Sequence, residues 1–234
     1  MTILPSKTQL DFDRIADLSK DEWNHNNHYD SFLLKQIPQS SEFDALEIGC
    51  GTGSFARILA QRFRRVLALD LSPRMIEIAK ERSTQYHNID FQVADVSVQN
   101  FSPEQFGCVA SIATLHHLPL EPMLFKMKSA LKAAGTLLVL DLFEAEGFAD
   151  FSASLLAVSV NIVPKLIKNG RIREPAEVQA AWAEHGRTDI YPTLSQVRRA
   201  CATILPKAQI KRHLLWRYSI VWKKAQNLFQ PTMG

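Results

Sequence analysis

Between residues 43 and 143 the chain alternates short apolar runs with helical patterns, and this alternation limits its possible folds more than any other feature. The apolar runs predict strands at 43–48, 66–70, 89–95, 106–114 and 135–143. One of the intervening helices is predicted to begin with Ser72 as its N-cap and Pro73 in its first turn. Strands that alternate with helices in this way predict an α/β fold with a parallel, doubly wound sheet.

Three further segments flank this core of 43–143. Residues 1–42 precede the first strand and are predicted to form a helical lid. Residues 144–190 look helical and interrupt the alternation, which indicates a cap over the sheet; its apolar stretch 154–163 either lines a pocket or packs as a helix. Residues 191–234 contain one helix and then two β-rich runs, which predict an antiparallel hairpin that completes the sheet. We expect one domain.

Composition narrows the class of protein. With 234 residues, 46% of them hydrophobic, the chain can build a sizeable core. The three cysteines, Cys50, Cys108 and Cys201, are far apart and odd in number, which argues against a disulfide framework and favours a cytoplasmic setting. The N-terminus does not resemble a secretory signal, and the longest apolar stretch, about 148–163, is shorter than the roughly 20 residues of a membrane span. We therefore expect no membrane span.

Charge is distributed unevenly along the chain. Residues 1–190 contain 19 Lys/Arg against 24 Asp/Glu, whereas residues 191–234 contain 8 Lys/Arg and no acidic residue. Such asymmetry is typical either of a nucleic-acid surface or of the solvated edge of a sheet. The basic residues alternate with Ile, Leu, Trp and Val as in a strand, which favours the sheet edge. No nucleic-acid partner is expected.

Acidic side chains and glycines follow the predicted strands. In an open parallel sheet, ligands bind beyond the carboxyl ends of the strands, where the strand order reverses. Glu47 and the glycine-rich loop 49–53 end the first strand, Asp70 ends the second and Asp95 ends the third. The segment 113–117 follows the fourth strand. These positions are therefore predicted to form one binding site.

The carboxylates indicate the kind of ligand. Glycines let the turn approach a ligand closely, but the dinucleotide pattern G-x-G-x-x-G from Gly49 has Ser54 in its last position. The carboxylate of Glu47 disfavours an anionic pyrophosphate and suits a cation. Asp70 can accept hydrogen bonds from both hydroxyls of a ribose, and Asp95 from an adenine amino group. The pattern favours an adenosine ligand with a positively charged amino acid end.

Four motifs carry a resemblance to a known family: "LEIGCGTGSF", "LALDLSPRMIEIAK", "FQVADV" and "ATLHHLP". Their order and spacing resemble those of class I S-adenosylmethionine-dependent methyltransferases, especially the small-molecule branch called methyltransferase type 11 or 12. The resemblance covers about residues 43–143, and "LKAAGTLLV", where the family usually has Pro-Gly-Gly, is the one departure. It implies a Rossmann-like methyltransferase fold with seven strands. It also implies that the chain uses S-adenosyl-L-methionine and releases S-adenosyl-L-homocysteine.

The resemblance also implies contacts with the methionine end of the cofactor. Gly49, Cys50 and Gly51 are expected to line the methionine part. Glu47 is expected to hold the amino group, and Ala113 to line the sulfonium side.

Contacts with the nucleoside follow from the next two motifs. By resemblance, Asp70 binds the ribose and Leu71 packs on the adenine. Asp95 and Val96 are expected to bound the adenine.

The polar stretch "WNHNNHY" at 23–29 allows two interpretations. Apolar residues at helical spacing predict a helix from about 27 to 37, with Asn26 or Asn27 as its N-cap. In the resembling family, the segment before the first strand folds across the cofactor, so His25, Asn26 and Tyr29 are candidate lid residues. A metal site is not predicted, because the two histidines of this stretch have no identified third ligand.

Histidines after the fourth strand are the candidates for proton transfer. Methyl transfer from a sulfonium is an in-line displacement, in which the protein mainly aligns the nucleophile and excludes water. A general base is needed only where the acceptor must lose a proton, and His116 is the candidate. Alternatively, one of His116 and His117 caps the loop while the other stacks on the pocket wall. His117, His185, Asp189 and Tyr191 are the predicted substrate contacts.

Three functions remain open from the sequence. The preferred one is methyl transfer to an oxygen, nitrogen or carbon nucleophile of a small molecule, by a monomer or homodimer. The second is an RNA or protein methyltransferase, which salt-dependent RNA binding would favour. The third is a non-enzymatic cofactor-binding protein, because a fold does not guarantee an activity.

Overall fold

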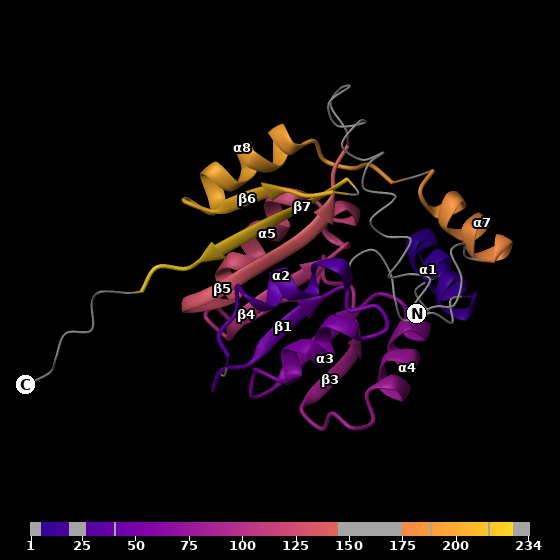
Figure 1. Ribbon diagram of the computed structural model, residues 1–234, viewed down its shortest axis with the longest axis horizontal. Coiled ribbons are helices and arrows are strands. Elements are labelled where there is room, and N and C mark those ends of the chain that lie inside the picture. The colour runs from indigo at the N-terminus through magenta and orange to yellow at the C-terminus, as the bar shows by residue number, and fades with distance from the viewer. Residues whose placement is uncertain are drawn as a thin grey trace, which may run out of the picture.

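The sheet has seven strands. In the computed structural model, which describes residues 6–18, 27–39, 41–144, 175–187, 189–214 and 216–226, their order is β3-β2-β1-β4-β5-β7-β6 (Figure 1). The strands are β1 (Ala45–Ile48), β2 (Val66–Asp70), β3 (Ile89–Val93), β4 (Phe106–Ile112), β5 (Leu131–Leu142), β6 (Gln209–Arg212) and β7 (Arg217–Lys223). β1 to β5 run parallel, and β7 is antiparallel to both β5 and β6. This topology confirms the predicted doubly wound sheet with its C-terminal hairpin.

Helices cover both faces of the sheet. They are α1 (Lys7–Leu18), α2 (Asp30–Leu34), α3 (Ser54–Ala60), α4 (Pro73–Arg82), α5 (Leu120–Ala130), α7 (Ala176–His185) and α8 (Leu194–Ile204), with 3₁₀ turns η1 (Asn27–Tyr29) and η2 (Leu115–His117). Side chains alternate along each strand, so Leu46 and Ile48 pack with α5 and α8, while Ala45 packs with α2 and α3 on the other face. None of the described helices is long and apolar enough to cross a membrane.

The turn from β2 into α4 agrees with the prediction. Ser72 is the N-cap of α4, and its Oγ accepts a hydrogen bond from the Met75 N–H at 3.0 Å; Pro73 is the first helical residue. The cap ends β2 sharply, which leaves Asp70 at the carboxyl edge of the sheet.

α1 and α7 lie side by side beyond the carboxyl ends of the parallel strands (Figure 1). Arg14 of α1 forms an ion pair with Glu184 of α7 at 2.7 Å. On its other side α1 contacts the start of α4, where Ser72 Oγ donates to Asp13 Oδ1 at 2.5 Å. Both helices therefore border the edge of the sheet at which ligands bind in this architecture.

The predicted cap is described in part. α7 agrees with the helix expected near 175–185 and begins after Pro175. Residues 145–174, which include the apolar stretch 154–163, lie outside the described residues.

The segment before β1 differs from the single helix expected at 27–37. Instead, η1 is followed by α2, which ends at Leu34. The N-cap position of α2 is Tyr29, whose side chain makes no capping hydrogen bond, and Asn27 lies inside η1. The predicted asparagine cap is therefore wrong for Asn27, while Asn26 lies outside the described residues. Pro38 disfavours a helical residue before it, which contributes to the early end.

Candidate active site

A cavity of about 570 Å³ opens at the carboxyl ends of β1 to β4 and is bordered by α1 and α7. Nine residues with predicted cofactor roles all line it: Glu47, Gly49, Cys50, Gly51, Asp70, Leu71, Asp95, Val96 and Ala113. They follow four strands that are separated in the sequence but adjacent in the sheet. The volume falls within the range of about 300–1,000 Å³ that is typical of small-molecule sites.

The loop between β1 and α3 needs its glycines for different reasons. Gly49, Gly51 and Gly53 have φ values of 73°, 51° and 78°, a region in which residues with a Cβ are strained. A Cβ at Gly49 would lie 1.9 Å from Thr114 Oγ1, whereas a Cβ at Gly51 would meet no atom within 4 Å. Gly49 therefore allows close packing inside the protein, and Gly51 leaves open space on the cavity wall.

The amides of this loop bind groups of the protein. Gly49 and Cys50 both donate their N–H to the Leu69 carbonyl, at 2.8 and 2.9 Å. Gly51 donates its N–H to Asp70 Oδ2 at 2.8 Å. These bonds hold the loop against the end of β2. The three amides are therefore already used within the protein, and the loop contributes to the cavity by its backbone conformation.

Glu47 is the most deeply buried carboxylate of the site. It is 1% exposed, and its Oε2 has no hydrogen-bond partner among the described residues. Burial, followed by the charge of Asp70, raises the pKa of Glu47 well above its usual value. A buried carboxylate with an unused oxygen on a cavity wall is suited to bind a cationic group, such as the ammonium of an amino acid.

Asp70 lies between the glycine loop and α4. Its Oδ2 accepts the N–H of Gly51, and its Oδ1 accepts the N–H of Ser72 at 2.9 Å. Burial raises the pKa of Asp70, and these amides oppose that rise. The two bonds fix the orientation of the carboxylate, while each oxygen keeps a further lone pair for a hydroxyl donor. Asp70 could therefore hold the diol of a ribose.

Asp95 and Val96, which follow β3, also line the cavity. Asp95 Oδ1 accepts both the N–H and the hydroxyl of Ser97, at 2.8 and 2.6 Å. Its other oxygen can accept a hydrogen bond from an exocyclic amine. Val96 is buried, and Leu71 lies across the same cavity. This combination of an acceptor and apolar side chains could hold an adenine ring.

Aromatic side chains also line the cavity. They are Phe12 of α1, His117 of η2 and Trp182 of α7. The ring centroid of Phe12 lies 5.4 Å from that of His117 and 6.4 Å from that of Trp182. This group of rings could contact a second, partly apolar molecule beside the cofactor.

His116 does not line this cavity. Its Nδ1 lies 2.6 Å from Asp141 Oδ1 of β5, and its backbone N–H donates to Asp141 Oδ2 at 2.8 Å. The side chain is 5% exposed, and His117 lies on the cavity side of it. The two histidines therefore have different surroundings: His116 is hydrogen-bonded to β5, and His117 lines the cavity. We do not retain His116 as the base.

The other predicted substrate residues gather behind His117. His185 lies with its ring centroid 5.0 Å from that of His117, and Asp189 Oδ1 lies 3.4 Å from His117 Nδ1. Tyr191 donates its hydroxyl to Asp189 at 3.1 Å and lines a separate cavity of about 550 Å³. Of the four predicted substrate residues, only His117 lines the 570 Å³ cavity, whose wall includes the glycine loop.

The surroundings of His117 affect its protonation. Burial, followed by the neighbouring His116, lowers the pKa of His117 to about 4. Its imidazole is therefore neutral at pH 7.

Tyr29 is the predicted lid residue that the structure describes, and it does not line the cavity. Tyr29 is buried, but its hydroxyl donates to the Leu214 carbonyl at 2.8 Å, and its ring contacts His213. Tyr29 therefore fixes η1 against the β6–β7 hairpin. His25 and Asn26 lie outside the described residues.

Several lining residues were not identified from the sequence. Phe12 and Ile15 of α1 close one side of the cavity, together with Trp182 of α7. The amphipathic pattern of 7–18 could have identified the helix, but not the surface it covers. Thr114 could have been suggested by its position directly after Ala113.

Comparisons with known proteins agree with this geometry. Residues 45–135 match the family described as a methyltransferase domain. An uncharacterized methyltransferase of Mycobacterium tuberculosis is 28% identical over 211 residues, which cover 86% of this chain and 96% of that protein. A ubiquinone biosynthesis O-methyltransferase of Coxiella burnetii is 26% identical, over 78% of this chain and 84% of that protein.

A solved structure shows a similar fold. It is a putative S-adenosylmethionine-dependent methyltransferase from Methanococcus maripaludis, with a TM-score of 0.63 and 17% identity, covering 98% of this chain and all of the other. The sheet order is that of a Rossmann-like methyltransferase fold, with the glycine loop and the strand-end carboxylates on the cavity wall. Residues 45–135 therefore carry a class I methyltransferase domain of the type 11/12-like kind, the domain of an enzyme that uses S-adenosylmethionine, and the chain as a whole is similar to proteins named methyltransferases.

Proposed function

We propose that the enzyme transfers the methyl group of S-adenosylmethionine to an oxygen or nitrogen of a small, partly apolar molecule. The observation that carries this proposal is the lining of the cavity, which combines three carboxylates, Glu47, Asp70 and Asp95, with three ring-bearing side chains, Phe12, His117 and Trp182. The carboxylates match the charge and hydrogen-bonding groups of the cofactor, and the rings offer the acceptor an aromatic wall.

Each cofactor contact has a physical role. Glu47 binds the ammonium, and Asp70 accepts from the ribose hydroxyls. Asp95 accepts from the adenine amino group, while Val96 and Leu71 pack against the ring. The loop of Gly49, Cys50 and Gly51 bounds the methionine part, and Ala113 lies on its sulfonium side.

Methyl transfer then needs alignment and exclusion of water. The acceptor atom donates an electron pair to the methyl carbon while the carbon–sulfur bond breaks, and the bonding pair remains on sulfur. A sulfonium thereby becomes a neutral thioether, so no protein group has to stabilise a new anion on the leaving group. Transfer requires the acceptor atom about 3 Å from the methyl carbon, and Phe12 and Trp182 would shield the acceptor from water there.

An acceptor that loses a proton suits this site. His117 is neutral, and carboxylates and further imidazoles surround it. Such a polar cluster favours a hydroxyl or an amine over a carbon nucleophile. The relative from ubiquinone biosynthesis is described as an O-methyltransferase, which supports the choice of a small hydroxylated acceptor.

A radiolabel experiment tests this function. Purified enzyme is incubated with methyl-labelled S-adenosylmethionine and a cell extract, and the products are separated by size. We expect label in low-mass compounds, and a Trp182→Ala variant should lose most of the transfer while keeping its affinity for S-adenosylhomocysteine. Label in RNA or protein alone would contradict the proposed acceptor class, and cofactor binding without any transfer would contradict a methyl-transfer role.

We also propose a cytoplasmic location. Cys50, Cys108 and Cys201 are all unpaired and buried, as is usual in a reducing compartment.

A further inference from the structure

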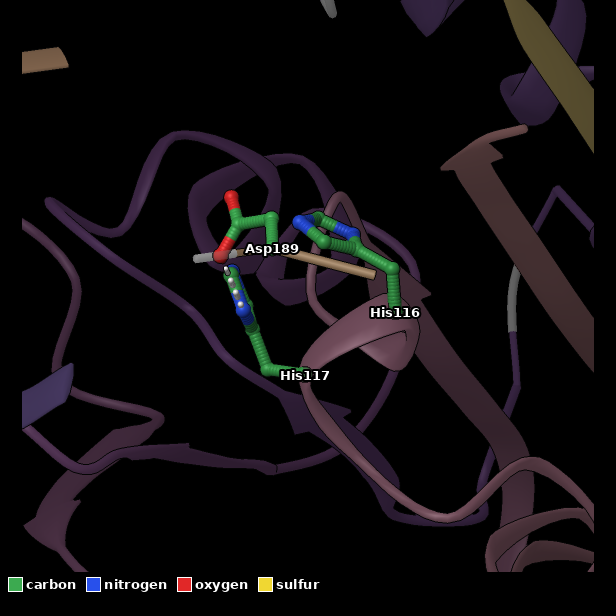
Figure 2. Close-up of side chains that lie close together, drawn as sticks. All are labelled: His116, His117 and Asp189. Carbon is green, nitrogen blue, oxygen red and sulfur yellow. Dashed lines mark ion pairs between the residues drawn. The ribbon is translucent and has the colours of Figure 1, made fainter. Parts of the chain in front are cut away.

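His116, His117 and Asp189 converge although Asp189 follows the histidines by more than 70 residues (Figure 2). One potential ligand atom of each residue lies within 4.8 Å of the others. The side chains of His117 and Asp189 are 13% and 7% exposed, so bulk water screens their interaction only weakly. A shielded group of two imidazoles and one carboxylate is unusual at a site that needs only to pack.

The spacing around Asp189 is longer than that of direct hydrogen bonds. Asp189 Oδ1 lies 3.4 Å from His117 Nδ1, and Oδ2 lies 3.6 Å from His185 Nε2. Ordinary N–H···O bonds measure about 2.7–3.2 Å. Two ligands of one cation, each about 2.1 Å from it, are roughly 3–3.5 Å apart. The separation of His117 and Asp189 therefore suits two atoms that share an ion.

Hydrogen bonds from outside the cluster orient two of the three ligands, His116 and Asp189. Because a carboxylate only accepts hydrogen bonds, Asp141 places a proton on His116 Nδ1 at 2.6 Å and leaves the Nε2 lone pair available. Tyr191 donates to Asp189 and fixes its carboxylate. Histidine ligands of metals are characteristically supported by such outer hydrogen bonds.

We propose that His116, His117 and Asp189 bind one divalent transition-metal cation, with Zn²⁺ as the best match. Imidazole nitrogens suit zinc and iron, whereas magnesium and calcium prefer sites built from oxygen ligands. Three protein ligands leave at least one position of a tetrahedral ion open. The ion joins the turn after β4, which borders the cavity, to the segment after α7.

His117 is the one proposed ligand on the cavity wall, so the chemical role of the ion rests on the proposed function and on access beside His117. A hydroxyl of the acceptor that bound the open position would become more acidic. Its proton would go to solvent, and the oxygen would keep the electron pair that attacks the methyl carbon. This role would narrow the proposed class of acceptors from molecules with an oxygen or nitrogen nucleophile to molecules with a hydroxyl group.

Zinc binding by the full chain tests the site. Enzyme freed of metal with a chelator and dialysed is titrated with Zn²⁺ by calorimetry. We expect one strongly bound equivalent in the wild type and in His87→Ala, which removes an exposed histidine far from the cluster. Asp189→Asn keeps the shape of the side chain but loses its charge, and should weaken this binding at least tenfold. All three proteins retain the cysteines, so zinc bound by thiols would not distinguish them.

A second, more conservative variant keeps the test valid if Asp189→Asn fails to fold. Tyr191→Phe keeps all three ligands and removes the bond to Asp189, and outer-sphere changes typically weaken metal binding by about 10–100-fold. Binding of S-adenosylhomocysteine shows that each variant is folded. The site is refuted by wild-type enzyme that binds S-adenosylhomocysteine but no zinc, or by Asp189→Asn and Tyr191→Phe variants that bind zinc like the wild type. Undiminished methyl transfer in excess chelator would refute the role of the ion and leave the proposed function intact.

Discussion

Replacing Glu47 with glutamine is expected to weaken binding of S-adenosylhomocysteine by about 100-fold or more. Glu47 is 1% exposed, and its Oε2 has no partner among the described residues. Once the ammonium of the ligand is bound, the two charges form a buried pair, and removing one partner of such a pair costs about 3–5 kcal/mol. Calorimetric titration of both proteins measures the difference. Glu42→Gln, which changes an exposed acid before β1, should bind like the wild type.

The same variant should affect the unliganded protein in the opposite direction. The pKa of Glu47 is raised in the folded state, so its favourable contribution is complete at acid pH and is lost as the pH rises through the raised pKa. Above that pKa the wild type must bury an ionised carboxylate, which costs stability, whereas a glutamine at position 47 stays neutral at every pH. Unliganded Glu47→Gln should therefore be at least as stable as the wild type at pH 7, and its relative advantage should shrink toward pH 4. Equal affinity of the two proteins for S-adenosylhomocysteine would contradict the role given to Glu47.

Gly49→Ala should destabilise the unliganded protein far more than Gly51→Ala. Both residues have positive φ values, which cost an alanine about 1–2 kcal/mol. Only at Gly49 does the new Cβ also meet Thr114, at 1.9 Å from its Oγ1, and overpacking adds about 1–3 kcal/mol. We expect losses of about 3 kcal/mol or more for Gly49→Ala and about 1 kcal/mol for Gly51→Ala.

Urea unfolding of the two variants in the absence of ligand measures this difference. The pair is matched because the same change is made two residues apart in one loop. Equal losses of unfolding free energy would show that Thr114 does not pack as closely on Gly49 as the structure indicates. Because Gly51 faces open space in the cavity, its variant should remain folded and yet bind the cofactor more weakly.

The α/β core was predictable because its signals are local. The first three strands are short apolar runs that lead into Gly49, Asp70 and Asp95, and the parallel topology gathers those residues at one edge. Ser72 and Pro73 marked the start of α4 with chemistry that operates within one turn. The placement of Glu47 and Asp70 on one cavity wall followed from these local features and the general rule for open sheets.

The acceptor end was less predictable because it depends on distant contacts. Phe12 and His185 meet across more than 170 residues, with ring centroids 4.6 Å apart, and no periodicity in either segment indicates the other. The choice between His116 and His117 depends on Asp141, a buried residue of β5 that the apolar pattern conceals. The path of 27–37 likewise depends on the bond from Tyr29 to Leu214, which lies in the C-terminal hairpin.

Titration of the purified enzyme with S-adenosylhomocysteine tests the central claim most directly. We expect saturable binding to the wild type, weakened at least tenfold in Asp70→Ala, because charge-assisted hydrogen bonds contribute about 1.5–3 kcal/mol. Thermal unfolding without ligand shows whether this variant keeps its fold after losing the bonds from Gly51 and Ser72. Absence of binding to the wild type, or undiminished binding to a folded Asp70→Ala, would contradict the assignment of this cavity to the cofactor.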